Sequence, residues 1–324
     1  MKIGIIGAGG IARTVSQTLQ QMNGMSLQAI ASRSMERAKE MQAEFGFAKA
    51  YDSYEALCSD PEVELVYIAT PHSHHYAHTM LALEHGKAVL CEKAFALNTQ
   101  QTKAMLAKAK EKGVLLAEAL WTRYMPSRAM IDKILNSGVI GKPRLLTANL
   151  CYPIWDKPRI YEPALAGGAL LDLGVYGLNF AGMHFGANVE RIASAVKLSA
   201  RGVDEMETIT LFYPDGRMAV LTHDIYARSD RKGIISGDLG YLVVENINNP
   251  QSITVFDTDD RQLAFYPVPQ QISGYEYEFL ETQASLADGL LENPSMPHAV
   301  TIQIMEQMDA LRRDWGMVYP QETT

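Results

Sequence analysis

A glycine-rich segment near the N-terminus has the residue types and spacing of a phosphate-binding loop. Residues 7–12 read GAGGIA and fit the pattern GxGxxG/A, directly after an apolar run and before a helical pattern. In such loops the first glycine permits a tight turn, the second lets the backbone approach a pyrophosphate, and the helix N-terminus offers N–H donors to the anion. The segment predicts a dinucleotide site, with a plain glycine turn as the alternative. The predicted contacts are Gly7, Gly9, Gly10, Ile11 and Ala12.

The end of the second predicted strand indicates which dinucleotide binds. Sites selective for NAD usually carry Asp or Glu there, about 20 residues after the glycines, to hold the ribose 2′-hydroxyl. This chain has Ser32, Arg33 and Ser34 instead. Arg33 can pair with a 2′-phosphate and Ser32 can donate to its oxygens, which favours NADP over NAD. Alternatively, Ser34 only caps the next helix and Arg33 is solvated.

Two polar segments follow neighbouring buried strands of the predicted sheet. The segment TPHSHH, residues 70–75, comes after one strand, and CEKA, residues 91–94, comes after the next. Ligands of open α/β sheets bind at the carboxyl ends of the strands, so both segments belong near the dinucleotide. The predicted contacts here are Thr70, Pro71, His72 and Glu92.

Together with GGALLDLGVY at residues 167–176, these segments form a combination typical of one family. The chain resembles the glucose-fructose oxidoreductase and inositol dehydrogenase (Gfo/Idh/MocA) family, whose pattern is a glycine loop, TPN-x-x-H, EKP and GG-x-x-x-D-x-G-x-H. The match spans residues 2 to about 179. EALWTRYMP at residues 118–126, and Tyr176 where many members have histidine, most resemble the dihydrodiol and xylose dehydrogenase branch.

The resemblance implies both a fold and a reaction. The fold is a Rossmann domain plus an α/β domain with an open, mainly antiparallel sheet. The reaction is NADP-dependent oxidation of a secondary or hemiacetal alcohol in a sugar, polyol or vicinal diol, or the reverse reduction. His75 matches the family's histidine and is expected to bond near the cofactor. Ala94 and His72 replace the family's proline and asparagine. Ala94 motivates the alternative of a redox-inactive NADP-binding sensor, and elimination through transient oxidation is a third possibility.

Three side chains have the chemistry that alcohol oxidation requires. A hydride goes to the nicotinamide, and a base takes the hydroxyl proton. Tyr176, with an ordinary pKa of about 10, needs a cation such as Lys93 to stabilise its phenolate. Asp172 lies four residues earlier on the same predicted helix face. We predict Tyr176 as proton donor and acceptor, Lys93 as the cation that tunes it, and Asp172 as the acceptor for a substrate hydroxyl and the orienter of Lys93. The alternatives are a surface pair of Lys93 with Glu92 and a half-buried aromatic Tyr176.

Weaker candidates flank these motifs. Trp121 and Arg123 follow the last strand of the first domain and are expected near the nicotinamide, with packing as the alternative. His74 and His78 have the helical spacing of zinc ligands, but no cysteine or acidic residue joins them, so no metal is predicted. An aromatic and basic loop is a candidate pocket lining, lid or subunit contact. Its residues are Tyr152, Trp155, Arg159 and Tyr161.

The elements that position these residues predict two α/β domains. Up to about residue 120, short apolar runs alternate with helical patterns, which indicates a parallel sheet of six strands. Asn98 and Gly113 bound a helix at 99–112, and Asp52 and Glu55 have capping-box spacing for a short helix. We expect residues 1–120 to bind the dinucleotide, and residues 121–324 to bind substrate and form a homodimer.

The composition excludes other classes of protein. With 47% hydrophobic and 20% charged residues, the 324-residue chain is globular. Its 29 basic and 37 acidic residues give a net charge of −8, which argues against nucleic acid or an anionic membrane as partner. Three cysteines without a CxxC pair indicate a reducing compartment, with cytoplasm as the expectation. The most apolar stretch, residues 167–187, contains Asp172, so no membrane span is expected.

Overall fold

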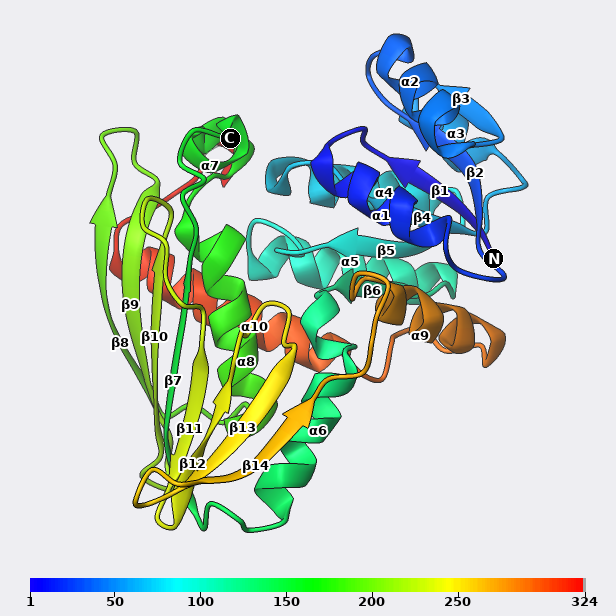
Figure 1. The fold of residues 1–324 in the computed structure, drawn as a ribbon. Coiled ribbons are helices and arrows are strands. Elements are labelled where there is room, and N and C mark those ends of the chain that lie inside the picture. Colours follow the sequence, from blue (N-terminus) through cyan, green and yellow to red (C-terminus); the bar gives the residue numbers. More distant parts are fainter. Residues whose placement is uncertain (323–324) are drawn as a thin grey trace. The chain divides into compact units, whose positions relative to one another are not determined.

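A computed structural model of the chain describes residues 1–322 and contains two compact units (Figure 1). Unit 1 consists of Met1–Trp121 and Gln271–Glu306, and unit 2 consists of residues 122–270 and those from 307 onward. The chain first passes from unit 1 to unit 2 after Trp121, one residue after the predicted boundary at residue 120. Residues 271–306, which we expected in the second domain, are instead part of unit 1.

Unit 1 contains a parallel sheet of six strands, as predicted. The strand order β3-β2-β1-β4-β5-β6 reverses its winding between β1 and β4, where open α/β sheets bind ligands at the carboxyl ends of the strands. The strands are β1 (Lys2–Ile6), β2 (Ser26–Ala31), β3 (Lys49–Tyr51), β4 (Leu65–Ile68), β5 (Ala88–Glu92) and β6 (Leu116–Ala119).

Local capping sets the limits of several helices in unit 1. Asn98 caps α5 with its side chain, and Gly113 ends it at a left-handed φ of +65°, as predicted. The predicted cap Asp52 is wrong: Ser53 caps α3 by accepting from Ala56 N at 3.3 Å, because it directly precedes the first turn. The helices are α1 (Gly10–Leu19), α2 (Met35–Phe45), α3 (Tyr54–Ser59), α4 (His72–Glu84), α5 (Thr99–Lys112) and α9 (Glu276–Ala287).

Both faces of the parallel sheet are buried, which explains its nearly continuous apolar strands. Alternate side chains enter two different cores: Ile5 and Tyr67 enter one, and Ile6 and Ile68 enter the other. Phe279 of α9 is fully buried in the first core, with its ring centroid 5.3 Å from that of Tyr67. This packing is the physical reason why α9 belongs to unit 1.

Unit 2 contains an eight-stranded, mainly antiparallel sheet, with the order β14-β13-β12-β11-β7-β10-β9-β8 and one parallel pair, β7 with β10. Turns at residues 213–217 and 257–261 connect β9 to β10 and β13 to β14. The strands are β7 (Pro143–Cys151), β8 (Arg191–Leu198), β9 (Asp204–Phe212), β10 (Met218–Asp224), β11 (Gly233–Gly237), β12 (Gly240–Val244), β13 (Ser252–Asp257) and β14 (Gln262–Pro267).

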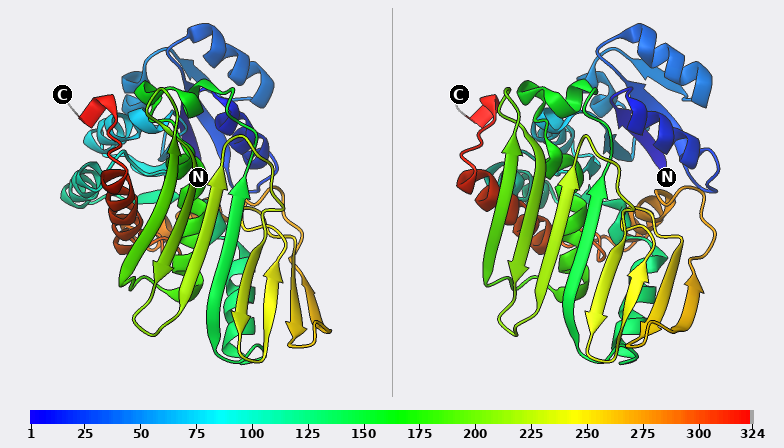
Figure 2. Two further views of the ribbon diagram at one scale, coloured as in Figure 1. Left: turned by 90° about the vertical axis from the view of Figure 1, so that its left-hand side faces the viewer. Right: turned by 60° about the vertical axis from the view of Figure 1, so that its left-hand side comes forward.

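Helices cover one face of this sheet and leave the other face without helices, as Figure 2 shows for α6 (Pro126–Asn136) and α8 (Val175–Phe185). A four-residue helix, α7 (Pro158–Tyr161), follows β7, and α10 (His298–Asp314) begins in unit 1 and ends in unit 2. The segment Pro163–Phe185 is long and apolar enough to cross a membrane by length and composition. However, 89% of its most apolar window is buried inside the protein, as in a core helix.

Candidate active site

The glycine loop between β1 and α1 lies at the carboxyl edge of the parallel sheet. Gly7 has a φ of +108°, and an added Cβ would lie 2.7 Å from Ala69 O, so only glycine fits. Gly9 and Gly10 face open space, because an added Cβ would meet no atom within 4 Å. The N-cap of α1 is Gly9, which brings no side chain to the first N–H groups of the helix. This arrangement fits a pyrophosphate.

The last two residues of the loop motif lie in the first turn of α1. Ile11 is partly exposed, whereas Ala12 is fully buried in the same core as Ile3 and Ile5. A small side chain at this motif position lets the helix pack closely on the sheet. Ala12 therefore supports the loop through packing.

The segment after β2 combines a helix cap with an exposed cation. Ser34 caps α2 by accepting from a backbone N–H at 3.4 Å, and it donates its own N–H to the buried Ser32 Oγ at 3.3 Å. Arg33 is exposed. Burial lowers the pKa of His74, and the positive charge of Arg33 lowers it further. The capping role of Ser34 and an exposed Arg33 are thus both present.

His75 joins the loops that follow β4 and β5. Its Nδ1 lies 2.7 Å from Ala94 O and its Nε2 lies 2.8 Å from Thr70 O, so both ring nitrogens are in use. Burial lowers the pKa of His75 to about 4, and the two carbonyl contacts act in the opposite direction. His75 is fully buried and holds the two loops together, and our expectation that it bonds near the cofactor stays a prediction. Since Gly7 packs beside Thr70, the glycine loop and the Lys93 segment lie at one sheet edge.

Lys93 follows β5 and is partly exposed, and the Lys93–Ala94 peptide bond is cis. Glu92 is buried. Its carboxylate accepts hydrogen bonds from the Tyr67 hydroxyl and, at 3.2 Å, from Lys93 N. The burial of Glu92 does not fit the alternative of an ion pair with Lys93 on the surface, and contact of Glu92 with a cofactor stays a prediction.

The remaining predicted residues after β4 surround the start of α4. Thr70 and Pro71 are partly exposed, and the Thr70 hydroxyl lies 3.0 Å from His78 Nδ1. His72 is buried and packs edge-on against His75, with ring centroids 5.6 Å apart. Within residues 1–322, no group of three or more histidine, cysteine, aspartate or glutamate side chains is placed to hold a metal ion.

Trp121 and Arg123 are both buried. The Trp121 ring stacks on Tyr275, with centroids 4.2 Å apart and planes at 7°. Arg123 donates to Asn179 Oδ1 at 3.0 Å. The structure shows the packing role that was the alternative, and contact with a cofactor stays a prediction.

Asp172 and Tyr176 lie in consecutive turns of unit 2. The predicted single α-helix begins instead with a π-helical segment, η3 (Leu170–Gly174), which contains Asp172, and Tyr176 lies in the first turn of α8. Isolated π turns occur frequently at functional sites. Both side chains are buried, and Arg159 of α7 forms an ion pair with Asp172. The sequence placed Arg159 in a candidate pocket loop but did not reveal this partner.

The η3 turn contacts three fully buried ionisable residues of β9 and β10, which sequence reasoning missed. Asp204 accepts from Leu170 N, and Glu207 Oε1 lies 2.9 Å from His223 Nδ1. Burial raises the pKa of Glu207 to about 8 and lowers that of His223 to about 3. Burial, and then the neighbouring Glu207, raise the pKa of Asp204 well above its ordinary value. Burial therefore shifts the pKa of each of the three side chains toward its uncharged form.

These buried side chains explain the glycines of the GGALLDLGVY segment and the glycine that follows it. Each of three glycines directly faces one member of the cluster, so an added Cβ would collide with it. The pairs are Gly168 with Asp204, Gly174 with Glu207, and Gly177 with His223. The available sequence signal was the acidic first half of β9, which contains Asp204 and Glu207 and precedes a less polar second half.

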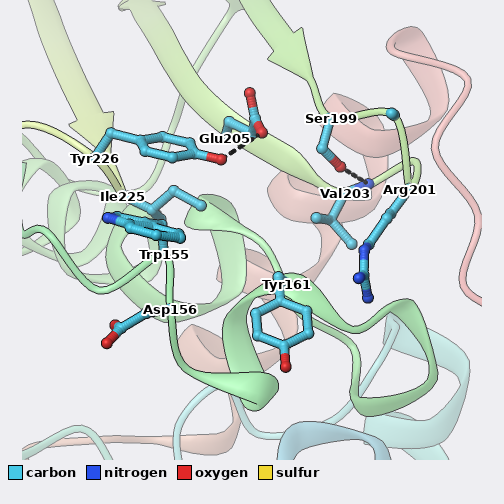
Figure 3. Close-up of a pocket in the computed structure, with 10 residues that line it drawn as sticks. Trp155, Asp156, Tyr161, Ser199, Arg201, Val203, Glu205, Ile225 and Tyr226 are labelled. Atoms are coloured by element: carbon cyan, nitrogen blue, oxygen red, sulfur yellow. Dashed lines mark hydrogen bonds between the residues drawn. The ribbon is translucent and has the colours of Figure 1, made fainter.

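A cavity of about 410 Å³ also opens in unit 2 (Figure 3). Trp155 and Tyr161 of the predicted pocket loop line it, whereas the Tyr152 hydroxyl accepts from Arg231 Nη1 at 3.1 Å. The other lining residues are Asp156, Ser199, Ala200, Arg201, Val203, Glu205, Ile225 and Tyr226.

Comparison with known proteins agrees with both halves of the chain. Residues 1–120 match the GFO/IDH/MocA oxidoreductase family with an NAD-binding Rossmann fold, and residues 129–243 match the GFO/IDH/MocA C-terminal domain. The trans-1,2-dihydrobenzene-1,2-diol dehydrogenase of Mus musculus is 33% identical over 335 residues, with 99% of each chain covered. The chain belongs to the Gfo/Idh/MocA oxidoreductase family.

Other Gfo/Idh/MocA relatives are similar over almost their whole length. The trans-1,2-dihydrobenzene-1,2-diol dehydrogenase of Homo sapiens is 32% identical over 330 residues, covering 99% of each chain. The crystal structure of KijD10, a 3-ketoreductase from Actinomadura kijaniata in complex with NADP and TDP-benzene, matches with a TM-score of 0.89. Its sequence is 26% identical, and 97% of each chain is covered. The family and the mixed α/β fold predicted from the sequence are thus confirmed.

Proposed function

We propose that this protein is an NADP-dependent oxidoreductase that transfers a hydride between the nicotinamide and a secondary or hemiacetal alcohol of a sugar, polyol or vicinal diol. The observation that carries the proposal is the chain of contacts from Gly7 through Thr70 and His75 to Ala94. It brings the phosphate-binding loop and Lys93 to the same sheet edge. The names of the relatives, a diol dehydrogenase and a 3-ketoreductase, support the substrate class.

The cofactor fits the shape and charge of this edge. The open space at Gly9 and Gly10 accommodates a pyrophosphate, and the exposed guanidinium of Arg33 supports a 2′-phosphate, hence NADP over NAD. When bound, NADP supplies the hydride acceptor at its nicotinamide ring.

The protein residues act on the proton and on the substrate orientation. During oxidation the carbinol C–H bond breaks with loss of a hydride, and the hydroxyl proton passes to Tyr176, so that the oxygen becomes a carbonyl oxygen. Lys93 binds this oxygen as a cation and stabilises its developing negative charge. Asp172, held by Arg159, accepts a hydrogen bond from a neighbouring substrate hydroxyl. In reduction Tyr176 returns the proton.

The variant Lys93→Met tests this assignment. We expect the turnover number to fall by roughly 10²–10⁴-fold, because a positioned catalytic group contributes about that much. NADPH affinity, measured by fluorescence titration, should stay measurable. The matched control is Lys103→Met, which removes an exposed lysine paired with Glu306. Turnover of Lys93→Met within twofold of wild type on every substrate of an aldose, polyol and diol panel would contradict the role of Lys93. NADP binding by wild type without any turnover would favour a sensor.

We also infer that the chain forms a homodimer through the open face of the unit 2 sheet. Paired positions on adjacent strands place partly exposed, β-branched apolar side chains in one row, including Val220, Ile234 and Val243. Such a row is suited to association with an identical face. Ile234→Lys should shift the sedimentation coefficient from dimer to monomer, and Thr254→Ala serves as a milder control. A wild-type chain that sediments as a monomer would refute the dimer.

A further inference from the structure

The cavity of unit 2 is a candidate binding site that the proposed roles of Asp172 and Tyr176 leave unused. Its volume of about 410 Å³ lies within the range of roughly 300–1,000 Å³ typical of small-molecule sites. Its walls come from the loop after β7 together with α7, from the β8–β9 turn with the start of β9, and from the two residues after β10 (Figure 3). All three segments belong to the same unit, so the cavity is a property of unit 2 alone.

Aromatic rings supply the flat surfaces of this cavity. Trp155 and Tyr226 stack on each other, with centroids 5.8 Å apart and planes at 14° (Figure 3). Both remain about half exposed, at 51% and 48%, although aromatic side chains of this size are usually more buried. The Tyr226 hydroxyl donates to Glu205 at 2.9 Å, which fixes its ring. A third ring, Tyr161, lies beneath the guanidinium of Arg201, with 4.8 Å between the guanidinium carbon and the ring centroid.

Charged and polar side chains line the cavity beside these rings. Asp156 and Glu205 offer carboxylate acceptors, and Arg201 offers guanidinium donors at the same cavity. A six-membered sugar ring has the matching chemistry, because its C–H face stacks on an aromatic ring and its hydroxyl edge bonds to carboxylates and guanidinium groups. Two of these charged groups also have protein partners, because Arg201 pairs with Glu162 and Glu205 pairs with Lys197.

The cavity is connected to the candidate catalytic residues by one short segment. Arg159 and Tyr161 are two residues apart in α7, and Arg159 pairs with Asp172 while Tyr161 lines the cavity. Between them, Ile160 O accepts from Gly168 N at 2.8 Å, which fixes α7 to the segment that leads into η3. A ligand in the cavity therefore contacts α7, the helix whose Arg159 forms the ion pair with Asp172.

We propose that this cavity is a subsite for the second sugar ring of a disaccharide or glycoside, stacked on Trp155. This inference rests on the proposed function, because it assigns the larger part of a sugar substrate to the cavity. It predicts that the protein binds a disaccharide more tightly than the corresponding monosaccharide. It also predicts that the difference depends on the aromatic face of Trp155.

Binding can be measured separately from turnover by calorimetric titration of the NADP-loaded protein. The probes are cellobiose, maltose and lactose, each compared with glucose or galactose, and catechol as an aromatic diol. We expect at least one disaccharide to bind about tenfold more tightly than its monosaccharide, as one stacked ring is worth up to about 1.5 kcal/mol. Trp155→Ala should remove this difference, and Trp155→Phe, which keeps an aromatic face, should restore most of it.

The remaining outcomes separate this inference from the proposed function. The control Trp315→Phe changes a partly exposed tryptophan that donates to Ser194, and it should leave disaccharide binding unchanged. Thermal unfolding of each variant verifies folding. Disaccharide binding that depends on Trp155, without turnover of any sugar or diol, would support the subsite and contradict the proposed reaction. Equal binding of monosaccharides and disaccharides, or Trp155-dependent binding of catechol alone, would overturn the subsite.

Discussion

The glycines of unit 1 and those of unit 2 serve opposite purposes. Gly9 and Gly10 leave space around the backbone, where a ligand can approach the N-terminus of α1. Gly174 and Gly177 leave no space, because side chains of β9 and β10 occupy the place that a Cβ atom would take. A glycine motif thus indicates close approach to a backbone, but the approaching group is a ligand in one unit and the protein's own buried side chain in the other.

The two regions also differ in their electrostatics. The unit 1 edge offers backbone N–H donors and the exposed cation Arg33, which suit an anion supplied from outside. In unit 2, Asp204, Glu207 and His223 are buried, and burial shifts the pKa of each toward its uncharged form. We therefore expect changes in unit 1 to alter ligand affinity, and changes beneath η3 to alter stability and its dependence on pH.

The largest expected effect concerns Glu207. Its pKa is raised by burial to about 8, so its stabilising contribution is complete below its ordinary pKa, about 4.5, and is lost as the pH rises through 8. In Glu207→Gln this pH-dependent loss of unfolding free energy should be absent. Its size is up to a few kcal/mol, at about 1.4 kcal/mol per pKa unit. Urea unfolding at pH 5 and pH 8.5 measures the free energy of unfolding at both ends of this range. Glu190→Gln, at an exposed site, is the control. An equal pH dependence in wild type and Glu207→Gln would contradict the buried-acid cluster.

A matched pair of glycine substitutions tests the comparison directly. Gly174→Ala should lower the free energy of unfolding by about 1–3 kcal/mol, because the added methyl group collides with Glu207. Gly9→Ala should leave the unfolding free energy of the cofactor-free protein nearly unchanged and weaken NADPH binding instead. Thermal unfolding and NADPH titration of both variants check this. A reversed pattern would show that the two motifs had been interpreted the wrong way round.

The smallest expected effect separates the two functions of the segment after β2. Arg33→Ala should weaken NADPH binding about tenfold more than NADH binding, as expected for one lost charge-assisted contact. Ser34→Ala removes the observed cap of α2 and should lower stability by about 1 kcal/mol without changing the NADPH-to-NADH ratio. Equal losses of both cofactors in Arg33→Ala would place recognition of the 2′-phosphate elsewhere.

The sequence predicted features that depend on neighbouring residues. The helix α5 (Thr99–Lys112) has its predicted bounds, because Asn98 and Gly113 are local start and stop signals. Apolar runs predicted all six strands of unit 1, since a parallel sheet covered on both faces needs continuous apolar strands. The glycine loop was found for the same reason, as its turn, helix start and preceding strand are consecutive in the chain.

Features created by distant residues could not be predicted. Phe279 completes a core whose strands lie more than 150 residues earlier in the chain, and no local pattern assigns it there. Asp204 and Glu207 are three residues apart, whereas alternate residues of a regular strand share a face, and the β8–β9 pairing shifts register at Asp204. The burial of the Glu92 side chain likewise depends on its hydrogen bond from Tyr67, which lies on the neighbouring strand.

The division of unit 1 into two chain segments has a consequence for how such proteins can be cut or recombined. The chain passes between the units after Trp121, after Gln270 and within α10. A fragment that stops at Trp121 lacks Phe279, so the apolar surface beside Tyr67 would be exposed to water. Replacing unit 2 of one relative with that of another therefore requires an internal exchange of residues 122–270 together with the residues from 307 onward, and not a simple swap of the C-terminal half.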